Sequence, residues 1–213
     1  MRDKFYFFSR SSNALPGLGT HESGDPHVYR VLGEMAEWRR VLSNFHVAPF
    51  FWRGHTWGSI EHAVQGMKTG MQDAEKALRF TIGSGHVIGQ GDGATAHKHR
   101  NVVTLTAENN MSWSMKSASV LVDAATAKYA QCAHASAVLE ATGDAELWHI
   151  MPRGRAHRFG HLEELRTRRR KAALCAPKEP ARKAREERAA ARDSAREERV
   201  DDEEDNDFYV HYH

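Results

Sequence analysis

The spacing of apolar residues along the chain predicts a mainly α-helical domain, an α+β fold with a few short strands near the N-terminus. Residues 5–8 are four consecutive aromatics, which is typical of a short strand that enters a core. A loop rich in Gly, Ser, Pro and Asn follows, from Ser9 to about Pro26. Further on, Arg53-Gly54 lies behind Pro49–Trp52, which predicts a turn between two short strands.

The clearest helical pattern begins at Ile60. From there apolar residues recur at i, i+3, i+4 and i+7, which places them on one face of a helix. Ser59 is suited to cap the N-terminus, and Glu61 lies in the first turn, where a carboxylate interacts favourably with the helix dipole. Glu61, Gln65 and Lys68 share an adjacent stripe, so three functional side chains point one way from a rigid element.

Three more helices are predicted farther along the chain. The first covers about residues 73–81, and the glycine-rich stretch 83–93 is expected to be a loop or a broken helix. This stretch has neither a preceding strand nor a following Gly-Lys-Ser/Thr, so it does not match a phosphate-binding loop. The longest pattern runs from about residue 115 to 139 and ends at Thr142-Gly143, and a last helix is expected over 160–174.

The composition changes towards the C-terminus. All five Trp lie in the first three quarters of the chain, whereas residues 177–200 contain no Leu, Ile, Met or aromatic residue and pair opposite charges four positions apart. Such a pattern is typical of a solvated single helix, and the acidic run 201–207 is expected to be disordered. We therefore divide the chain into a domain at residues 1–172 and a charged tail at 173–213, which is a possible binding segment for a protein partner.

Charge and cysteine content narrow the class of protein. The formal net charge is +2, so no global attraction to nucleic acid or membrane is expected, and two distant cysteines favour a reducing compartment. The N-terminus lacks a signal-peptide pattern, and no stretch approaches the roughly 18 apolar residues of a membrane span. We expect an intracellular, cytoplasmic protein. The basic cluster Arg166–Lys171 leaves a nuclear location open, although a solvated helix end is the simpler interpretation.

The segment between Leu42 and Lys68 carries the strongest motif. It reads LSNFHVAPFFWRGHTWGSIEHAVQGMK. Its Leu-Ser-Asn-Phe run, Pro-Phe strand, Gly-containing turn and helix opening with Glu-His closely resemble the NADAR family, also called YbiA-like. The matching positions are Leu42, Ser43, Asn44, Phe45, Pro49, Phe50, Gly54, Trp57, Glu61, His62, Gln65 and Lys68.

The resemblance continues in the same order over about residues 5–165. The later matching positions are Ser112, Trp113, Lys116, Ala127, Lys128, Tyr129, Gln131, Leu139, Thr142, Gly143 and Leu147. Two features depart from the family. Many members have an Asp where this chain has Ser112, and a Trp-Gly-x-Gly motif that the region following Thr142-Gly143 lacks.

The resemblance implies a YbiA-like fold and N-glycosidase chemistry on substrates related to ADP-ribose. We expect hydrolysis of a ribose N-glycosidic bond, on an ADP-ribosylated guanine or nucleotide, in ADP-ribosylated nucleic acid for example, or on a ribosyl-amine phosphate of the riboflavin pathway. The two departures favour an alternative, a non-catalytic module that binds ADP-ribose or a nucleotide. No cofactor is expected for either function.

Glu61 and Lys68 are the predicted catalytic residues. Cleavage of a ribose–nitrogen bond builds positive charge at C1 of the sugar, and a buried carboxylate such as Glu61 stabilises that charge or activates water. Lys68 has two possible roles that the sequence does not separate. It binds a phosphate or protonates the leaving group, or it forms a Schiff base with ring-opened ribose.

A second set of residues is predicted to bind the substrate. Amides are suited to orient ribose hydroxyls, tryptophans to stack on a base, and arginines to meet a diphosphate. The predicted residues are Ser43, Asn44, Phe45, Trp57, His62, Gln65, Arg100, Trp113, Trp148 and Arg153. No metal site is expected, because the histidine pairs at 97/99 and 157/161 have neither a Cys pair nor an HExxH pattern beside them.

Overall fold

The computed structural model describes residues 2–151 and 155–175. The chain divides into two compact units, residues 1–169 and 170–213. The helix expected at 177–200 and the acidic run at 201–207 lie outside the described residues. Among the residues described, no helix combines the length and the apolar content that crossing a membrane requires.

Helices make up most of the described structure. Their bounds are α1 Arg30–Glu34, α2 Trp38–Val41, α3 Ile60–Gly70, α4 Ala74–Leu78, α5 Val87–Gln90, α6 Gly93–Lys98, α7 Ala107–Gln131, α8 Ala133–Ala141 and α9 Gly160–Cys175, with a 3₁₀ turn at Ile82–Ser84. The mainly helical α+β fold predicted from the sequence is therefore confirmed. The glycine-rich stretch is the expected broken helix, because α5 and α6 are short and separated by Gly91.

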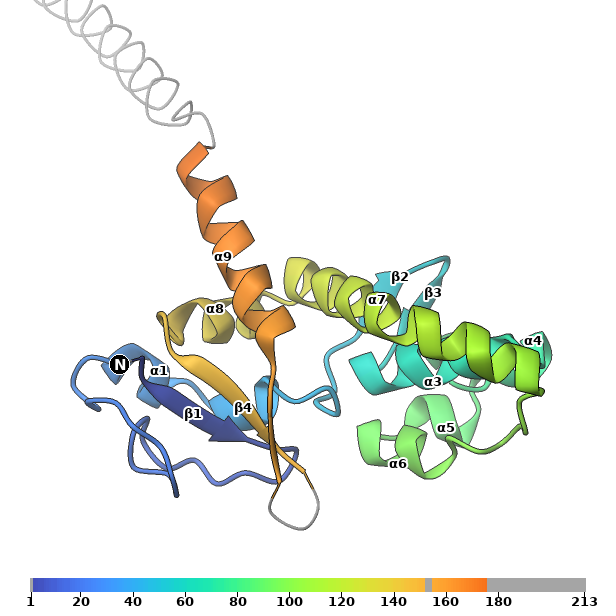
Figure 1. Cartoon of the computed structure of the whole chain (residues 1–213), viewed down its shortest axis with the longest axis horizontal. Helices are drawn as coiled ribbons and strands as arrows, with labels where there is room; N and C mark the ends of the chain where they lie inside the picture. The colour runs from blue at the N-terminus through green and yellow to red at the C-terminus, as the bar shows by residue number, and fades with distance from the viewer. Residues whose placement is uncertain (1, 152–154, 176–213) are drawn as a thin grey trace, which may run out of the picture. The chain divides into compact units, whose positions relative to one another are not determined.

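The larger sheet joins the two ends of unit 1. Strand β1 (Lys4–Phe7) runs parallel to β4 (Glu146–Ile150), which pairs antiparallel with β5 (Ala156–Arg158). Figure 1 shows β1 and β4 side by side although about 140 residues separate them. The strand at β1 was predicted, whereas β4 and β5 were not. Because the partner of β4 is so distant in the sequence, no local pattern marks it.

The second sheet is a hairpin of β2 (Phe50–Trp52) and β3 (His55–Trp57). Arg53 and Gly54 form the predicted turn, with φ of +50° and +81°. Two successive residues with positive φ are typical of a type I′ turn, whose twist matches that of a hairpin. The turn delivers the Trp57 ring, which is 2% exposed, to the face of α3. Gly66 makes this approach possible, since a Cβ there would lie 2.4 Å from the ring.

The longest helix differs from its prediction at both ends. Helix α7 begins at Ala107, where the Thr106 side chain caps it, instead of at about residue 115. It ends at Gln131 because Cys132 has an extended backbone, and α8 follows directly. The break was not predicted because no Gly or Pro marks it in the sequence, and hydrogen bonding continues across it. The Cys132 N–H donates to the Lys128 carbonyl, and the Cys132 carbonyl accepts from Ser136 N–H.

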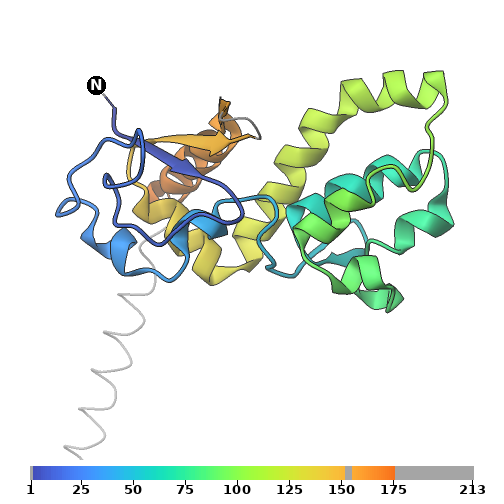
Figure 2. The same cartoon turned by 90° about the horizontal axis from the view of Figure 1, so that it is seen from below.

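Helices α3 to α7 gather on one side of unit 1 and position the site. Helix α3 packs against α4, α6 and α7 in both views (Figures 1 and 2). A continuous core connects these helices to the larger sheet. Fully buried members include Phe5, Phe7, Leu32, Leu42, Ile60, Ala63, Phe80, Ala124, Tyr129, Leu139, Leu147 and Leu162.

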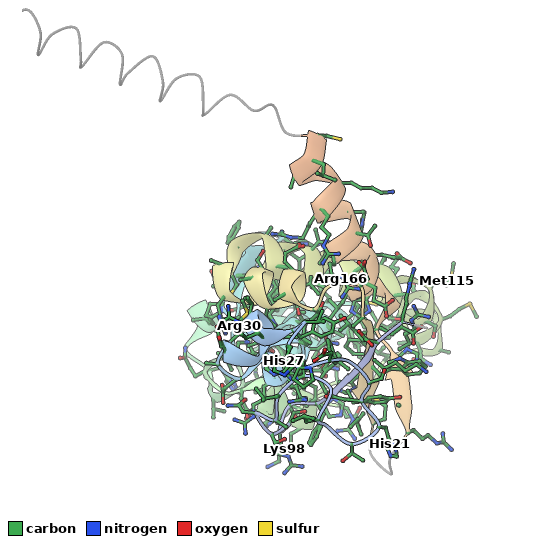
Figure 3. All side chains as sticks on the ribbon, turned by 90° about the vertical axis from the view of Figure 1, so that its left-hand side faces the viewer. His21, His27, Arg30, Lys98, Met115 and Arg166 are labelled. Atoms are coloured by element: carbon green, nitrogen blue, oxygen red, sulfur yellow. The ribbon has the colours of Figure 1, made fainter. Side chains whose placement is uncertain are left out.

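The basic cluster on α9 is partly internal. Arg166 is 3% exposed and donates to the Thr142 hydroxyl and the Ala145 carbonyl. In Figure 3 Arg166 lies at the packed end of α9, whereas Met115 extends outward from α7. The interpretation of this cluster as a solvated helix end is therefore wrong for Arg166, because the guanidinium satisfies polar groups at the C-terminus of α8.

Candidate active site around Glu61

The site is built on the first turn of α3. The Ser59 side chain accepts a hydrogen bond from the His62 N–H, which confirms the predicted N-cap. The Glu61 N–H donates to the Asn44 carbonyl at 3.0 Å, so the Leu-Ser-Asn-Phe segment is fixed to the same helix end. Glu61 itself is only 8% exposed. A helix N-terminus stabilises a carboxylate, which makes this a favourable place for a buried acid.

The Glu61 carboxylate has one oxygen engaged and one free. Oε1 lies 2.8 Å from Nδ1 of His97 on α6 and 2.9 Å from Nε2 of Gln65. No residue that the structure describes bonds to Oε2. The His97 side chain is 47% exposed, so the acid is reached from the α6 side. A buried carboxylate with an unused oxygen is suited to a reacting centre.

Two buried acceptor atoms near Glu61 lack a hydrogen-bond partner. They are Oδ1 of Asn44 and Oε1 of Gln65, both shielded from solvent in this part of the chain. Gln65 is 8% exposed and its amide nitrogen already donates to Glu61. An unsatisfied buried acceptor is costly, so a donor that reaches it after a small side-chain shift, from a ligand or a water molecule, is favoured. Both residues were predicted to orient ribose hydroxyls, and hydroxyls are such donors.

Phe45 contacts His97 and also lines a cavity, whose lining does not include Glu61. Its ring centroid is 5.4 Å from that of His97, and its carbonyl accepts from Gly93 N–H. Gly93 is required there, because a Cβ would lie 2.3 Å from the Phe45 Cα. The cavity has a volume of about 710 Å³, which is large enough for a nucleotide-sized ligand. Its lining residues are Ser9, Arg10, Glu37, Arg40, Phe45, His46, Val47, Asp92 and Ala94.

Lys68 lies on the same stripe as Glu61, as predicted, and is half-buried. Its Nζ donates to the Arg100 carbonyl at 3.3 Å. The Arg100 guanidinium in turn donates to the His97 carbonyl at 3.2 Å. These contacts join α3 to the end of α6, so Lys68 and Arg100 lie on the His97 side of the site. Both bonds are to backbone carbonyls and not to charged groups. The Lys68 ammonium and the Arg100 guanidinium can therefore still bind an anion.

Three of the predicted binding residues are enclosed by protein. His62 is fully buried, with Nδ1 2.8 Å from the Ser59 hydroxyl and Nε2 3.0 Å from the Ile88 carbonyl, and burial lowers the pKa of this imidazole. A neutral ring that donates to Ile88 fits these contacts. Trp57 is 2% exposed and donates to the Trp52 carbonyl. Ser43 is fully buried and accepts from Phe45 N–H. All three position the site instead of facing a ligand.

The structure describes no hydrogen bond or ring contact between Glu61 and either Trp113 or Trp148. Trp113 is half-buried on α7. Trp148 is on β4, where it stacks on Tyr6 at 6.2 Å and donates to Glu146. The contacts that the structure describes for Trp148 are all with the larger sheet, which is paired through a strand that the sequence did not predict. Arg153 lies outside the described residues.

His97 is the residue of the site that sequence reasoning missed. The segment Ala-His-Lys-His-Arg was noted only for metal binding, and no group of three or more His, Cys, Asp or Glu among the described residues is arranged to hold a metal ion. His97 meets Glu61 across 36 residues, through the packing of α6 on α3. The only local signal is the last turn of a helix, where a histidine is common.

These elements define an α+β fold in which a small mixed sheet and a hairpin are combined with a helical layer that carries the buried acid. Such a fold is shared with a solved structure, the solution NMR structure of the Escherichia coli protein YbiA. The TM-score is 0.54 at 20% sequence identity, and the match covers 84% of this chain and 93% of that chain. The predicted YbiA-like fold is therefore confirmed. No family model matches the chain, and no curated protein matches its sequence.

Proposed function

We propose that this chain hydrolyses a ribose N-glycosidic bond, with Glu61 as the carboxylate at the reacting centre. One observation carries the proposal: Glu61 is buried at a helix N-terminus with Oε2 unpartnered among the described residues, beside two unpartnered acceptors, Asn44 Oδ1 and Gln65 Oε1. The substrate class follows from the resemblance to the NADAR family. It is an ADP-ribosylated guanine or nucleotide, or a ribosyl-amine phosphate.

The chemistry assigns each group a task. As the bond between C1 and nitrogen breaks, its electron pair leaves with the nitrogen, and positive charge develops on the ribose. Glu61 Oε2 stabilises that charge or accepts a proton from the attacking water, whose oxygen forms the new bond to C1. Asn44 and Gln65 accept hydrogen bonds from the ribose hydroxyls and hold C1 at the carboxylate.

The role of Lys68 is proposed in two forms. Among the described residues its Nζ bonds only to a backbone carbonyl, so it can bind a substrate phosphate or donate a proton to the departing nitrogen. Alternatively its Nζ attacks C1 of the ring-opened sugar and displaces the substrate nitrogen, which leaves as the protonated amine. Water then hydrolyses the resulting Schiff base and frees both the lysine and the sugar. Trapping with borohydride separates these forms, because only a Schiff base is reduced to a stable adduct on Lys68.

A carboxamide substitution at Glu61 tests the proposal. Wild type, Glu61→Gln and Glu75→Gln are incubated with ADP-ribosylated guanine DNA, ADP-ribosylated guanosine and a ribosyl-amine phosphate, and release is followed by mass spectrometry. Glu75 also lies in the first turn of a helix but is exposed, so it is the matched control. Loss of general base catalysis is expected to lower turnover by Glu61→Gln about 100-fold or more and to leave Glu75→Gln unchanged. Equal turnover by all three proteins would overturn the proposal.

The second candidate function is a binding module of the same fold. It is favoured by two features of the sequence, Ser112 in place of the family's Asp and the missing Trp-Gly-x-Gly motif. In that case folded wild-type protein releases nothing from the three substrates, while calorimetry detects binding of ADP-ribose. Binding should then survive in Glu61→Gln, because the shape of the site is kept.

A further inference from the structure

A buried lysine lies beneath the segment that carries Asn44 and Phe45. Lys128 of α7 is fully buried, and its Nζ donates to the Val41 carbonyl at 3.0 Å and to the Ser43 carbonyl at 3.5 Å. Burial lowers the pKa of Lys128 to about 7, and among the described residues only Cys132 opposes this effect. A fold tolerates an ammonium group in such a place only at a cost in free energy.

The lysine meets a chain segment that needs donors. Helix α2 ends at Val41, and the last carbonyls of a helix have no partner within it. A cation near these carbonyls satisfies them and interacts favourably with the helix dipole. Three residues farther along α7, Gln131 bonds to both the N–H and the carbonyl of Phe51, each at 2.8 Å. Helix α7 therefore holds the chain on both sides of the Asn44–Phe45 pair.

The held segment contacts each component of the site. The Asn44 carbonyl accepts from Glu61 N–H at 3.0 Å, and the Phe45 ring lies against His97. The Phe45 carbonyl accepts from Gly93 N–H at 3.3 Å, which connects the segment to the start of α6. A displacement of this segment would therefore move Asn44 Oδ1, which has no partner among the described residues, relative to Glu61 and His97.

We propose that Lys128 is a positioning residue of the site, which fixes the backbone between Val41 and Ser43 so that Asn44 and Phe45 meet Glu61 and His97. Its effect on turnover rests on the proposed function, whereas its hold on the segment does not. A purely stabilising role would not require a lysine. An apolar side chain of similar volume in place of a buried charge is often neutral or stabilising.

Lys128→Met separates the two roles, and Lys116→Met is the matched control because Lys116 is exposed on the same helix. Amide hydrogen exchange is measured on the full chain by NMR. The exchange rates of the Phe45 and Glu61 amides are each divided by the rate at Leu139, a buried residue of α8. These ratios are expected to be about tenfold higher in Lys128→Met than in the wild type. The unfolding midpoint should stay the same or rise. Lys116→Met should match the wild type in every measurement.

A kinetic measurement connects this effect to the site. On whichever substrate the wild type cleaves, Lys128→Met is expected to raise KM more than it lowers kcat, because Asn44 orients the substrate and Glu61 remains in place. If the wild type cleaves none of them, the proposed function fails, but the exchange rates still decide the role of Lys128.

Two results would overturn the positioning role. The first is exchange at Phe45 and Glu61 that stays at the wild-type rate or accelerates only in proportion to Leu139. The second is failure to fold of both Lys128→Met and Lys128→Gln, which keeps a hydrogen-bond donor. That outcome would assign Lys128 to stability alone. Intermediate exchange in Lys128→Gln is the result expected if its amide replaces part of the lysine's hold.

Discussion

Glu61 and Glu163 are equally buried, at 8% exposure each, but their surroundings differ. Arg158 donates to both carboxylate oxygens of Glu163, at 3.0 and 2.7 Å, and the Leu147 N–H adds a third bond. Burial alone would raise the pKa of Glu163, but these hydrogen bonds outweigh it and lower the pKa. Glu61 instead shares a single oxygen between an imidazole and an amide.

The difference shows what each carboxylate does. Both carboxylate oxygens of Glu163 are bonded, by the Arg158 guanidinium and the Leu147 N–H, so Glu163 joins β4, β5 and α9. At Glu61 the fold leaves one carboxylate oxygen and two neighbouring amide oxygens without partners among the described residues. Complete satisfaction is typical of a structural acid, whereas unmet capacity in a buried place favours a ligand.

The largest stability effect should follow from Glu163→Gln. An amide cannot accept a bidentate guanidinium, so we expect the free energy of unfolding to fall by about 2 kcal/mol, as for lost hydrogen bonds to a charged group. Urea unfolding at pH 7 measures it. Glu61→Gln should change stability by less than about 0.5 kcal/mol, because a neutral side chain is easier to bury. A greater loss of stability in Glu61→Gln than in Glu163→Gln would contradict this difference between the two carboxylates.

Smaller effects on the free energy of unfolding are expected at two glutamines, Gln65 and Gln131. Gln65→Leu removes a buried oxygen that has no described partner and also the 2.9 Å bond to the Glu61 carboxylate, so the two effects offset and the free energy of unfolding should change by less than about 0.5 kcal/mol. KM should rise about fivefold, because the proposed ribose contact is lost. Gln131→Leu should destabilise the chain by about 1 kcal/mol, since both ends of that amide are bonded to Phe51. Thermal unfolding and initial rates on the cleaved substrate check both.

A loss of stability in Gln65→Leu with no change in KM would contradict the role of Gln65 as a ligand acceptor. It would show instead that the amide serves only to hold Glu61 through its 2.9 Å bond. Gln131→Leu is the control for the loss of an amide as such, because it lies on α7 and is not among the residues that contact Glu61.

The parts of the molecule that the sequence predicted are those decided over short distances. The Ser59 cap, the Arg53-Gly54 turn and the stripe of Glu61, Gln65 and Lys68 each depend on residues within a few positions. Strand β4 was missed because its partner is β1, at the other end of the domain. His97 was missed for the same reason, since helix packing alone brings it to Glu61.

The site residues show the same limit. Asn44 and Gln65 of the motif both bond to Glu61, but the motif did not distinguish side chains that could face a ligand from those that hold the backbone. His62 and Trp57 have the spacing of site residues, yet their polar atoms form hydrogen bonds to other protein groups. That distinction depends on three-dimensional hydrogen bonding, which residue identity does not determine.

The smallest predicted effect concerns the histidines packed around Phe159 in the larger sheet. His149 stacks on this ring at 4.9 Å and His161 lies 4.8 Å from it, each with one ring nitrogen buried and without a described partner. Burial, with a contribution from His157, lowers the pKa of His149 and lowers that of His161 to about 4. The unfolded chain therefore binds protons that the folded protein does not, between about pH 6.5 and pH 4.

Because the unfolded state takes up more protons in this window, the free energy of unfolding should fall as the pH falls through it. His161→Phe keeps a ring against Phe159 but cannot be protonated, so its loss of stability between pH 6.5 and 4.5 should be smaller than that of the wild type. Urea unfolding at intervals of half a pH unit measures the slope. His27→Phe, at an exposed position, should keep the wild-type slope. An unchanged slope in His161→Phe would mean that the acid sensitivity arises elsewhere. It would also mean that the His161 ring is not shielded from protonation as its packing against Phe159 indicates.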